Sequence, residues 1–264
     1  MDLDLTGKTA LVTGSTAGIG YAAALGLARM GAAVAVNGRT QDAVDAAVAA
    51  IEADVGRGDA RGVVADLGTA EGCDSAIRQL PEVDVLVNNV GIFGPKPFPE
   101  IADADWQQFF DVNVMSGVRM TRTYLPGMFQ RDWGRVVFVS SESGVFIPSE
   151  MIHYGMTKSA QLAVARGVAE TTVGTNVTVN SVLPGPTWSR GVGDFVQQMA
   201  DDQGKDVATV EREFFEHVRP TSLIKRFATP DEAANMICYV CSPAASATNG
   251  AALRVEGGIV RSIV

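Results

Sequence analysis

The chain has 264 residues, of which 47% are hydrophobic, and a formal net charge of −9. This length and apolar share suffice for one large hydrophobic core. The negative charge argues against a nucleic-acid-binding protein, because a phosphate-binding face needs an excess of Lys and Arg. The first residues are acidic, and no apolar run reaches the roughly 18 residues of a membrane span. We therefore expect a soluble, cytoplasmic protein that binds a small molecule.

Short β-branched runs alternate with alanine-rich helical stretches through the first part of the chain. The runs expected to form strands are 8–13, 32–37, 62–66 and 83–89, and the helical stretches between them are 19–30, 41–51 and 71–80. A long helix from about Asp103 is expected next. It is followed by a strand at 135–140, a helix from Tyr154 to about Val173, a strand at 176–182, a helix from Asp231 and a short strand at 251–256.

The expected strands are almost continuously apolar, which is typical of strands that are covered on both faces. Their alternation with helices predicts an α/β fold, a doubly wound parallel sheet of the Rossmann type with about seven strands, in one domain over residues 1–264. One long irregular region, 184–227, follows the sixth strand. Because ligands bind beyond the carboxyl ends of such strands, we expect a substrate lid at about 186–227; ordinary helix packing is the alternative.

A glycine-rich loop joins the first expected strand to the first expected helix. Its sequence TGSTAGIG occupies residues 13–20, and its glycines would let helix amides approach a pyrophosphate. A plain glycine turn is the alternative, but the strand-turn-helix setting favours dinucleotide binding. The loop residues predicted to line the cofactor are Gly14, Ser15, Thr16, Gly18, Ile19 and Gly20.

The second expected strand ends in Asn37, Gly38 and Arg39, where an acid commonly holds the free 2′-hydroxyl of an NAD ribose. No acid is present, and the Arg39 guanidinium suits a 2′-phosphate, so the sequence favours NADP over NAD. An Arg39 that only faces solvent is the alternative. Asp66, at the end of the third strand, would reach the adenine edge or cap the next helix. The predicted contacts in this region are Asn37, Arg39, Thr40, Asp66 and Leu67.

Tyr154 and Lys158 are four residues apart on an expected helix, so they share one face. A cation about 4 Å from the phenolate oxygen would favour the ionised form by up to ~4 kcal/mol at an effective dielectric near 20. The pKa of Tyr154 would then move from about 10 towards neutrality. Such pairs also occur on exposed helices. The presence of Ser141, upstream of Tyr154, and of Asn113 in the long helix favours the catalytic interpretation.

Six segments match the motifs of one family in order and spacing: TGSTAGIG, NNVG, VNVMSG, VSSESG, YGMTK and VNSVLPGPTWS. The chain resembles the short-chain dehydrogenase/reductase family, as a 3-oxoacyl reductase-like member, over nearly its whole length. The resemblance implies that Tyr154 is the general acid or base at the substrate oxygen and that Lys158 lowers its pKa and holds the nicotinamide ribose. It also implies that Ser141 donates a hydrogen bond to that oxygen and that Asn113 holds a water that relays protons to Lys158.

The resemblance implies further cofactor contacts after the fourth and sixth strands. They are Asn88, Gly91, Tyr154, Lys158, Pro184, Gly185, Thr187 and Ser189. Val90 stands where the family usually has alanine, and Ser143 is a second hydroxyl close to Ser141. Glu142, between the two serines, is expected to be a solvated or supporting acid. No metal is expected, because the cofactor carries the hydride and protein groups stabilise the alkoxide.

Cys238 and Cys241 form a C-x-x-C pair late in the helix expected from Asp231. Redox pairs favour helix N-termini, and two histidines with one further cysteine make a poor zinc site. We expect both thiols to pack in the core.

The leading functional hypothesis is NADP-dependent hydride transfer between nicotinamide and a carbonyl or secondary alcohol of a partly hydrophobic small molecule. The apolar candidates near the substrate are Phe93, Phe146, Met151 and Trp188. A 3-oxoacyl-[acyl-carrier-protein] reductase is the first alternative, although only Arg131 and Arg135 suggest a basic patch for an acidic carrier. A catalytically silent nucleotide-sensing protein is the second. The resemblance implies a homodimer or homotetramer, formed through the helix from Asp103 to Phe129 and the Tyr154 helix.

Overall fold

Seven parallel strands form one sheet in the order β3-β2-β1-β4-β5-β6-β7. The computed structural model describes residues 1–263, except for the side chains of residues 190, 194 and 195. The strands are β1 (Thr9–Val12), β2 (Ala33–Gly38), β3 (Arg61–Val64), β4 (Val85–Asn88), β5 (Gly134–Val139), β6 (Val177–Pro184) and β7 (Ala252–Val255). In the central strand, Val12 lies opposite Val36 of β2 and Val87 of β4. The strand order reverses between β1 and β4, which opens a crevice for ligands at their carboxyl ends.

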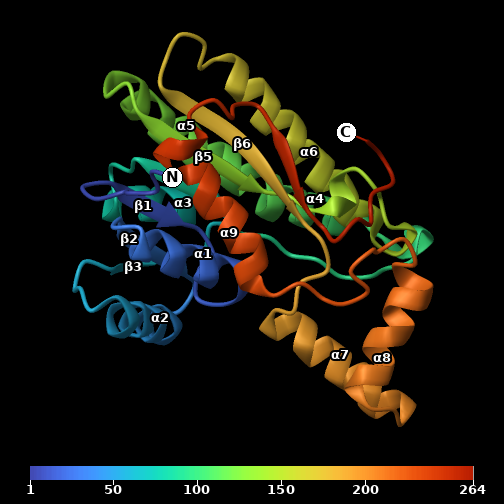
Figure 1. The fold of residues 1–264 in the computed structure, drawn as a ribbon. Helices are drawn as coiled ribbons and strands as arrows, with labels where there is room; N and C mark the ends of the chain where they lie inside the picture. The colour runs from blue at the N-terminus through green and yellow to red at the C-terminus, as the bar shows by residue number, and fades with distance from the viewer. Residues whose placement is uncertain (264) are drawn as a thin grey trace.

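Helices cover both faces of this sheet, so the predicted doubly wound α/β fold is confirmed. They are α1 (Gly18–Arg29), α2 (Gln41–Val55), α3 (Ala70–Gln79), α4 (Asp103–Phe110), α5 (Ser116–Gln130), α6 (Ile152–Glu170), α7 (Arg190–Gln203), α8 (Val207–Glu213) and α9 (Pro230–Cys241). One hydrophobic cluster packs α1, α2 and α9 on one face, and a second packs α3, α5 and α6 on the other (Figure 1). No helix within residues 1–263 is both long and apolar enough to cross a bilayer.

Several single-turn helices connect these elements. The 3-10 turns are η1 (Phe98–Glu100), η3 (Glu142–Gly144), η4 (Ser149–Met151) and η6 (Pro243–Ala245), and the π turns are η2 (Asp111–Met115) and η5 (Phe214–Val218). The long helix expected from Asp103 is therefore α4, the π turn η2 and α5 in succession. Such π turns occur frequently at functional sites, because the extra residue redirects backbone and side-chain polar groups.

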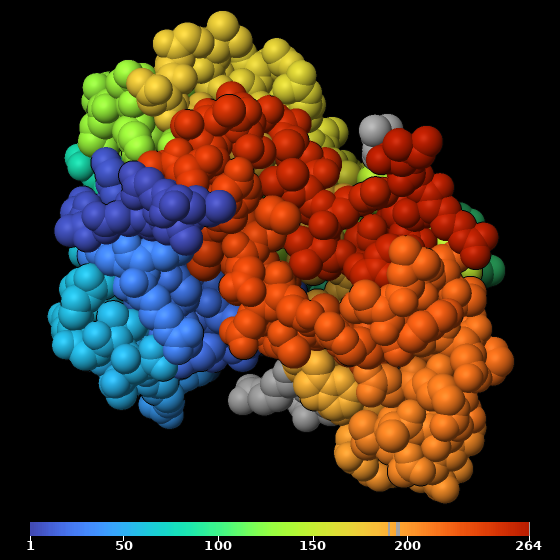
Figure 2. Space-filling view, viewed as in Figure 1, coloured from blue at the N-terminus to red at the C-terminus, as the bar shows by residue number. Residues whose placement is uncertain are grey.

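The segment between β6 and α9 forms a small lobe that projects beyond one end of the sheet (Figures 1 and 2). We call residues 186–227 the insertion. It has its own hydrophobic cluster, built around Val196, Val210, Phe215 and Phe227. Its base is closed by two backbone hydrogen bonds, in which Trp188 donates to the carbonyl of Ala228 (2.8 Å) and Ala228 donates to that of Pro186 (2.9 Å). We call the residues that make these two bonds, Pro186, Trp188 and Ala228, the neck of the insertion.

Candidate active site

Ser141, Tyr154 and Lys158 meet at the carboxyl end of β5. Ser141 follows that strand and begins η3, where its hydroxyl accepts a hydrogen bond from the amide of Ser143 (3.1 Å). Tyr154 and Lys158 lie on α6, one turn apart, and α6 packs against η3. The Lys158 ammonium lies 5.6 Å from the centre of the Tyr154 ring and donates to the carbonyl of Val139 (3.0 Å). Of the two hydroxyl groups, Ser141 is the one that influences the pKa of Tyr154.

The electrostatic surroundings of Tyr154 differ from the sequence expectation. Burial raises the pKa of Tyr154, and the negative charge of Glu142 raises it further; the interaction with the Ser141 side chain and the charge of Arg219 lower it. Lys158 does not lower this pKa here, because its ammonium group points to the carbonyl of Val139 rather than to the phenol. A close pair on one helix face is therefore not sufficient to bring Tyr154 towards neutrality in the cofactor-free protein.

Burial also perturbs Lys158 itself. Loss of solvation lowers the pKa of Lys158 from 10.5 to about 8, and the charge of Glu142 acts in the opposite direction. An ammonium group in this position remains mostly protonated at pH 7 but can lose its proton at mildly alkaline pH. It can therefore exchange protons with a neighbouring group at moderate pH.

Asn113 occupies the middle of the π turn η2 and connects the loop after β4 to α6. Its side chain accepts from the amide of Ile92 (2.7 Å) and donates to the carbonyl of Ile92 (3.0 Å) and the hydroxyl of Thr157 (2.9 Å). Its backbone carbonyl accepts a hydrogen bond from Gln161 (2.6 Å). Asn113 thus fixes the loop beside Lys158 through both its side chain and its backbone.

The glycine loop after β1 has the features of an anion cradle. Helix α1 has no side-chain cap and no acid in its first turn, whereas Thr69, Ser189, Asp206 and Thr229 cap four other helices. Uncapped amides at a helix N-terminus favour phosphate. Gly18 has φ +58°, and a Cβ on Gly20 would lie 2.4 Å from the Asn89 amide nitrogen, so a larger side chain would fill the loop. These residues fit a dinucleotide.

The other predicted loop contacts differ in accessibility. Thr16 is partly exposed and Ile19 packs on its inner side against the first hydrophobic cluster. Ser15 is buried: its hydroxyl donates to the carbonyl of Val12 (2.6 Å) and accepts from the amide of Asn37 (3.0 Å). Its side chain therefore holds the loop to the sheet.

The residues at the end of β2 differ in whether their side chains are available to a ligand. The Asn37 amide oxygen accepts from the amide of Gly14 (3.0 Å), and its nitrogen donates to the carbonyls of Val63 (3.0 Å) and Ala65 (3.2 Å), so Asn37 braces the loop from within. Arg39 and Thr40 are exposed. Among the described side chains, no carboxylate lies within ion-pair distance of Arg39. Its guanidinium is therefore available to a ligand.

Gly38 is the last residue of β2 and lies between Asn37 and Arg39. A Cβ there would lie 2.5 Å from the Thr16 side chain and 2.9 Å from that of Val44. Contacts this short do not occur between real side chains, so an acid at this position would require Thr16 or Val44 to move. The sequence has no acid at the end of β2, and the packing around Gly38 also disfavours a larger side chain there.

Some of the residues after β3 and β4 that were predicted to contact the cofactor are buried or hydrogen-bonded to other protein groups. Asp66 is exposed and accepts from the amide of Gly68 (3.0 Å), while Thr69 rather than Asp66 caps α3. Leu67 is buried in the second hydrophobic cluster. Asn88 donates to Thr121 (3.0 Å), and its amide oxygen has no hydrogen-bond partner within the described part of the chain. Gly91 lies beside Asn113 and Lys158, because a Cβ on it would be 3.5 Å from the Lys158 ammonium nitrogen.

The segment after β6 approaches the glycine loop from the other side. Pro184 ends β6, and Gly185 lies so close to the backbone of Glu256 that its Cβ would be only 2.8 Å away. Thr187 is buried and donates to the carbonyl of Gly185 (2.9 Å). Ser189 caps α7, and its Cβ would be 3.3 Å from one on Gly18. Thr187 and Ser189 therefore border the crevice that the glycine loop opens.

Three functional residues were not recognised from the sequence as parts of one site. Asn89 donates to the carbonyls of Thr13 (2.9 Å) and Gly14 (3.1 Å) and so ties the glycine loop to β4. Glu142 is buried, and it accepts a hydrogen bond from Ser141 (2.5 Å). Arg219, at the end of the insertion, is buried against Glu142. The second asparagine of NNVG was a usable signal for Asn89, but no local pattern links Arg219 to Glu142.

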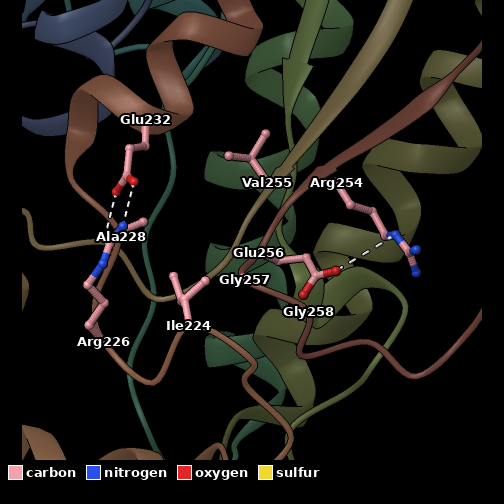
Figure 3. Close-up of a pocket in the computed structure, with 9 residues that line it drawn as sticks. All are labelled: Ile224, Arg226, Ala228, Glu232, Arg254, Val255, Glu256, Gly257 and Gly258. Atoms are coloured by element: carbon pink, nitrogen blue, oxygen red, sulfur yellow. Dashed lines mark hydrogen bonds and ion pairs between the residues drawn. The ribbon is translucent and has the colours of Figure 1, made fainter.

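A separate pocket of about 330 Å³ lies between the insertion and the turn after β7 (Figure 3). Its walls carry two ion pairs, Arg226 with Glu232 (2.7 Å) and Arg254 with Glu256 (3.7 Å). It contains none of the residues around Tyr154. Among the side chains that the structure describes, no group of three or more His, Cys, Asp or Glu residues has the arrangement of a metal site.

Comparisons with known proteins agree with this architecture. A family model described as short chain dehydrogenase matches residues 8–205. The oxidoreductase YvrD of Bacillus subtilis (strain 168) is 48% identical over 266 residues, which is 100% of both chains. The 3-oxoacyl-[acyl-carrier-protein] reductase FabG of Aquifex aeolicus (strain VF5) is 30% identical over 263 residues, which is 98% of this chain and 100% of that one.

A solved structure extends the similarity to the whole three-dimensional fold. The L-sorbose reductase from Gluconobacter frateurii, complexed with NADPH and L-sorbose, has a TM-score of 0.94 and 30% identity over 100% of both chains. The family model and the two relatives confirm the resemblance inferred from the six sequence motifs. The chain belongs to the short-chain dehydrogenase family and is an NAD(P)-dependent oxidoreductase that acts on a small molecule.

Proposed function

We propose that the protein is an NADP-dependent reductase or dehydrogenase that interconverts a carbonyl and a secondary alcohol. The observation that carries the proposal is the joint position of Ser141, Tyr154 and Lys158 at the carboxyl end of β5, beside an uncapped glycine loop. When bound there, the nicotinamide cofactor supplies or accepts the hydride. The pyrophosphate would be held by the amides from Gly18 to Gly20, and the ribose and nicotinamide by residues near Lys158 and Thr187.

The protein groups handle the proton and the charge. In reduction, the Tyr154 hydroxyl donates its proton to the substrate oxygen, and Ser141 donates a hydrogen bond to the same atom. Ser141 must first rotate its hydroxyl proton away from Glu142, which accepts its hydrogen bond in this structure. The Lys158 ammonium group, once turned from the carbonyl of Val139, then supplies positive charge near the phenolate that remains. Asn113 holds the loop that carries Gly91 in place beside Lys158 and lies on the path by which protons would return to it.

NADP is the proposed cofactor form. Arg39 is exposed and free of described carboxylates, and Gly38 is too crowded for the acid that would read a 2′-hydroxyl. A guanidinium can bind a 2′-phosphate through two parallel hydrogen bonds. The L-sorbose reductase of similar fold, which was solved with NADPH, supports the same preference.

The proposed substrate is a small molecule with an apolar part next to the reacting carbonyl. The Phe93 ring meets the Tyr154 ring edge-on, with centroids 6.3 Å apart, and its face is half exposed. Trp188 instead packs on Phe227 (5.3 Å) and so belongs to the insertion's own cluster. We propose that the insertion is the lid over this substrate, because its neck begins directly beside Thr187.

Reduction of carrier-bound 3-oxoacyl groups is the second candidate, favoured by the similarity to FabG. The two arginines considered for carrier docking argue against it. Arg135 is buried in β5 and donates to the carbonyls of Gly134 (2.8 Å) and Asn176 (2.9 Å). Arg131 is paired with Glu82 (3.6 Å) and Asp84 (3.3 Å). Neither offers a free cation to an acidic carrier.

One set of measurements tests the reaction and the cofactor together. The wild type, Tyr154→Phe and Arg39→Ala are titrated with NADPH and NADH by cofactor fluorescence. They are then assayed for NADPH oxidation with a panel of ketones that includes L-sorbose and a 3-oxoacyl carrier thioester. Tyr154→Phe should keep its cofactor affinity and lose about 10³-fold in kcat, because a general acid typically contributes 10²–10⁴-fold. Arg39→Ala should weaken NADPH by about tenfold and leave NADH unchanged.

Three results would count against the proposal. Turnover by Tyr154→Phe at the wild-type rate would remove the assigned acid. Equal affinity of the wild type for NADPH and NADH would remove the NADP preference. Cofactor binding without turnover of any ketone or alcohol, in a protein whose Tyr154→Phe variant behaves identically, would favour the nucleotide-sensing alternative.

A further inference from the structure

Arg219 is a buried arginine that the insertion contributes to the Tyr154 site. It follows the π turn η5, and its side chain is only 7% exposed. Its Nε lies 3.5 Å from one carboxylate oxygen of Glu142, and its Nη1 lies 2.9 Å from the carboxylate of Glu150 in η4. One guanidinium therefore joins the insertion to both single-turn helices that precede α6.

Glu142 connects this arginine to the reacting groups. Its other carboxylate oxygen accepts the Ser141 hydroxyl (2.5 Å), and its side chain is only 6% exposed. A buried carboxylate is costly unless it is paired and hydrogen-bonded. In the described part of the chain, Arg219 is the cation within ion-pair distance of Glu142, and Lys158 interacts with the Glu142 charge from farther away.

We propose that Arg219 is a positioning residue that couples the insertion to the proton step: by neutralising Glu142, it permits negative charge to develop on the Tyr154 oxygen. The inference rests on the proposed role of Tyr154. When Tyr154 gives up its proton, a phenolate forms near the Glu142 carboxylate, and the two negative charges repel. The Arg219 guanidinium offsets this repulsion. Insertion packing and proton donation are thereby linked through one side chain.

The other charged groups around Tyr154 do not duplicate this role. Lys158, on the same helix, has its ammonium group turned to the carbonyl of Val139. His153 faces the rings of Trp106 and Phe109 on α4. Lys96, in the loop that carries Phe93, is bound to Asp105 (2.5 Å).

The directions of the charge effects on Tyr154 agree with the geometry. Apart from burial, Glu142 raises the pKa of Tyr154 and Arg219 lowers it. Glu150 is already bound by Arg219 and is part of the same network. Removal of the guanidinium should therefore raise the pH at which Tyr154 ionises, and removal of the Glu142 charge should lower it.

The test is a direct titration of Tyr154, so it needs no substrate. Phenolate absorbance near 295 nm is followed against pH, and subtraction of the Tyr154→Phe curve isolates Tyr154 from the other tyrosines. The proteins are titrated while saturated with NADP⁺, because burial raises the pKa of Tyr154 in the free protein into the range in which alkali unfolds proteins. Glu142→Gln should lower the Tyr154 transition by about one pH unit, and Arg219→Met should raise it by a similar amount. The double variant should return close to the wild type, and Arg219→Lys should restore most of the shift.

Arg226→Met is the matched control within the insertion. It removes a forked ion pair to Glu232 (2.8 and 2.7 Å) but no charge next to Tyr154, so the transition should not move. If Arg219→Met does not fold because two carboxylates lose their partner, the comparison of Glu142→Gln with the double variant decides. In the Glu142→Gln background, the additional loss of Arg219 should again raise the pH of the Tyr154 transition by about one unit.

Unchanged Tyr154 transitions in Glu142→Gln and Arg219→Met would overturn the inference. So would an equal shift in Arg226→Met, because the effect would then reflect loosening of the insertion rather than charge. Neither outcome depends on turnover. The proposed function fails separately, if Tyr154→Phe retains activity.

Discussion

At the scale of single residues, Lys158 combines a chemical role with a cost in stability. Its amine is fully buried, and its pKa is lowered by burial from 10.5 to about 8. A folded-state pKa below the unfolded one means that folding disfavours the charged amine. Above pH 10.5 the amine is neutral in both states and burial costs no stability. As the pH falls from 10.5 to about 8, the free energy of unfolding decreases. At pH 7 the protein therefore bears nearly the whole penalty.

Lys158→Met should be inactive but more stable than the wild type at pH 7. The pKa shift corresponds to about 3 kcal/mol, and the lost bond to the Val139 carbonyl costs about 1 kcal/mol, which leaves a net gain of about 1–2 kcal/mol. Urea unfolding of the cofactor-free proteins measures this gain. It should shrink by pH 10, where the folded wild-type amine is neutral. A gain that is the same at both pH values would contradict the burial argument.

The sequence predicted single residues best where their partners are close along the chain. Ser141, Tyr154 and Lys158 were identified from motif spacing, and the structure brings them together at η3 and α6. The direction of the Tyr154 pKa was not predictable, because it depends on Glu142 and on Arg219, which approaches from the insertion. The inward orientation of Asn37 and Asn88 was also missed, since a sequence cannot show on which side of a strand end a polar group is satisfied.

At the scale of elements, the insertion behaves as a unit with its own core. Phe227 is buried and touches the rings of Phe214 (5.1 Å), Phe215 (5.1 Å) and Trp188 (5.3 Å). These contacts are separate from the two clusters that pack against the sheet. The insertion should therefore be able to open locally while the sheet and its helices stay folded.

Phe227→Ala should loosen the insertion without unfolding the domain. Truncation of a buried Phe typically costs about 3–5 kcal/mol, and here the loss falls on a cluster of few residues. Hydrogen exchange followed by mass spectrometry should show faster exchange at 190–218 and unchanged exchange in β1, β4 and β5. Leu27→Ala, in the cluster around α1, is the control and should destabilise the whole sheet instead. Uniformly faster exchange in Phe227→Ala would show that the insertion is not an independent unit.

The sequence predicted the elements well and their interruptions poorly. The helix expected from Asp103 is present, but the π turn at Asp111–Met115 divides it, and Asn113 lies at its centre. Apolar periodicity cannot reveal one extra residue in a helical turn. The π turn is instead stabilised by the hydrogen bonds that the Asn113 side chain makes with Ile92 and Thr157, which are distant in sequence.

At the scale of the whole molecule, the fold joins its first and last helices. Helices α1 and α9 pack together in the first hydrophobic cluster. A Cβ on Gly26 of α1 would lie 2.5 Å from the Cys238 sulfur of α9. Burial raises the pKa of the Cys238 thiol to about 12, so this cysteine packs as a small apolar group. Cys241 is buried in the same cluster and Cys238 packs against it, so the C-x-x-C pair belongs to the core, as the sequence predicted.

Gly26→Ala should destabilise the protein by about 1–2 kcal/mol, because overpacking outweighs the better helix propensity of alanine. In a Cys238→Ala background the sulfur is absent, and the same substitution should become neutral or stabilise by up to about 1 kcal/mol. Four urea unfolding curves, for the wild type, the two single variants and the double variant, measure this reversal of sign. An identical effect of Gly26→Ala in both backgrounds would show that the two helices do not touch as described.

The overall topology was the most predictable level. Continuous apolar strands alternating with helices admit few arrangements, and right-handed crossovers leave the doubly wound sheet as the natural solution. The arrangement of the segment after β6 was less predictable, because its helices pack mainly on each other.

The neck of the insertion has a consequence for how such proteins diversify. Because Pro186, Trp188 and Ala228 bond to one another across its base, the chain leaves the sheet and returns to it at the same place. Segments between two such fixed points can change in length and composition at little entropic cost. In the proposed role of the insertion as a substrate lid, a loop transplanted from a relative would alter substrate preference while Thr187 and Ser189, at its first residues, stay in place beside the glycine loop. A chimaera joined after Ser189 and before Ala228 would keep the proposed coenzyme contacts and acquire a new substrate range.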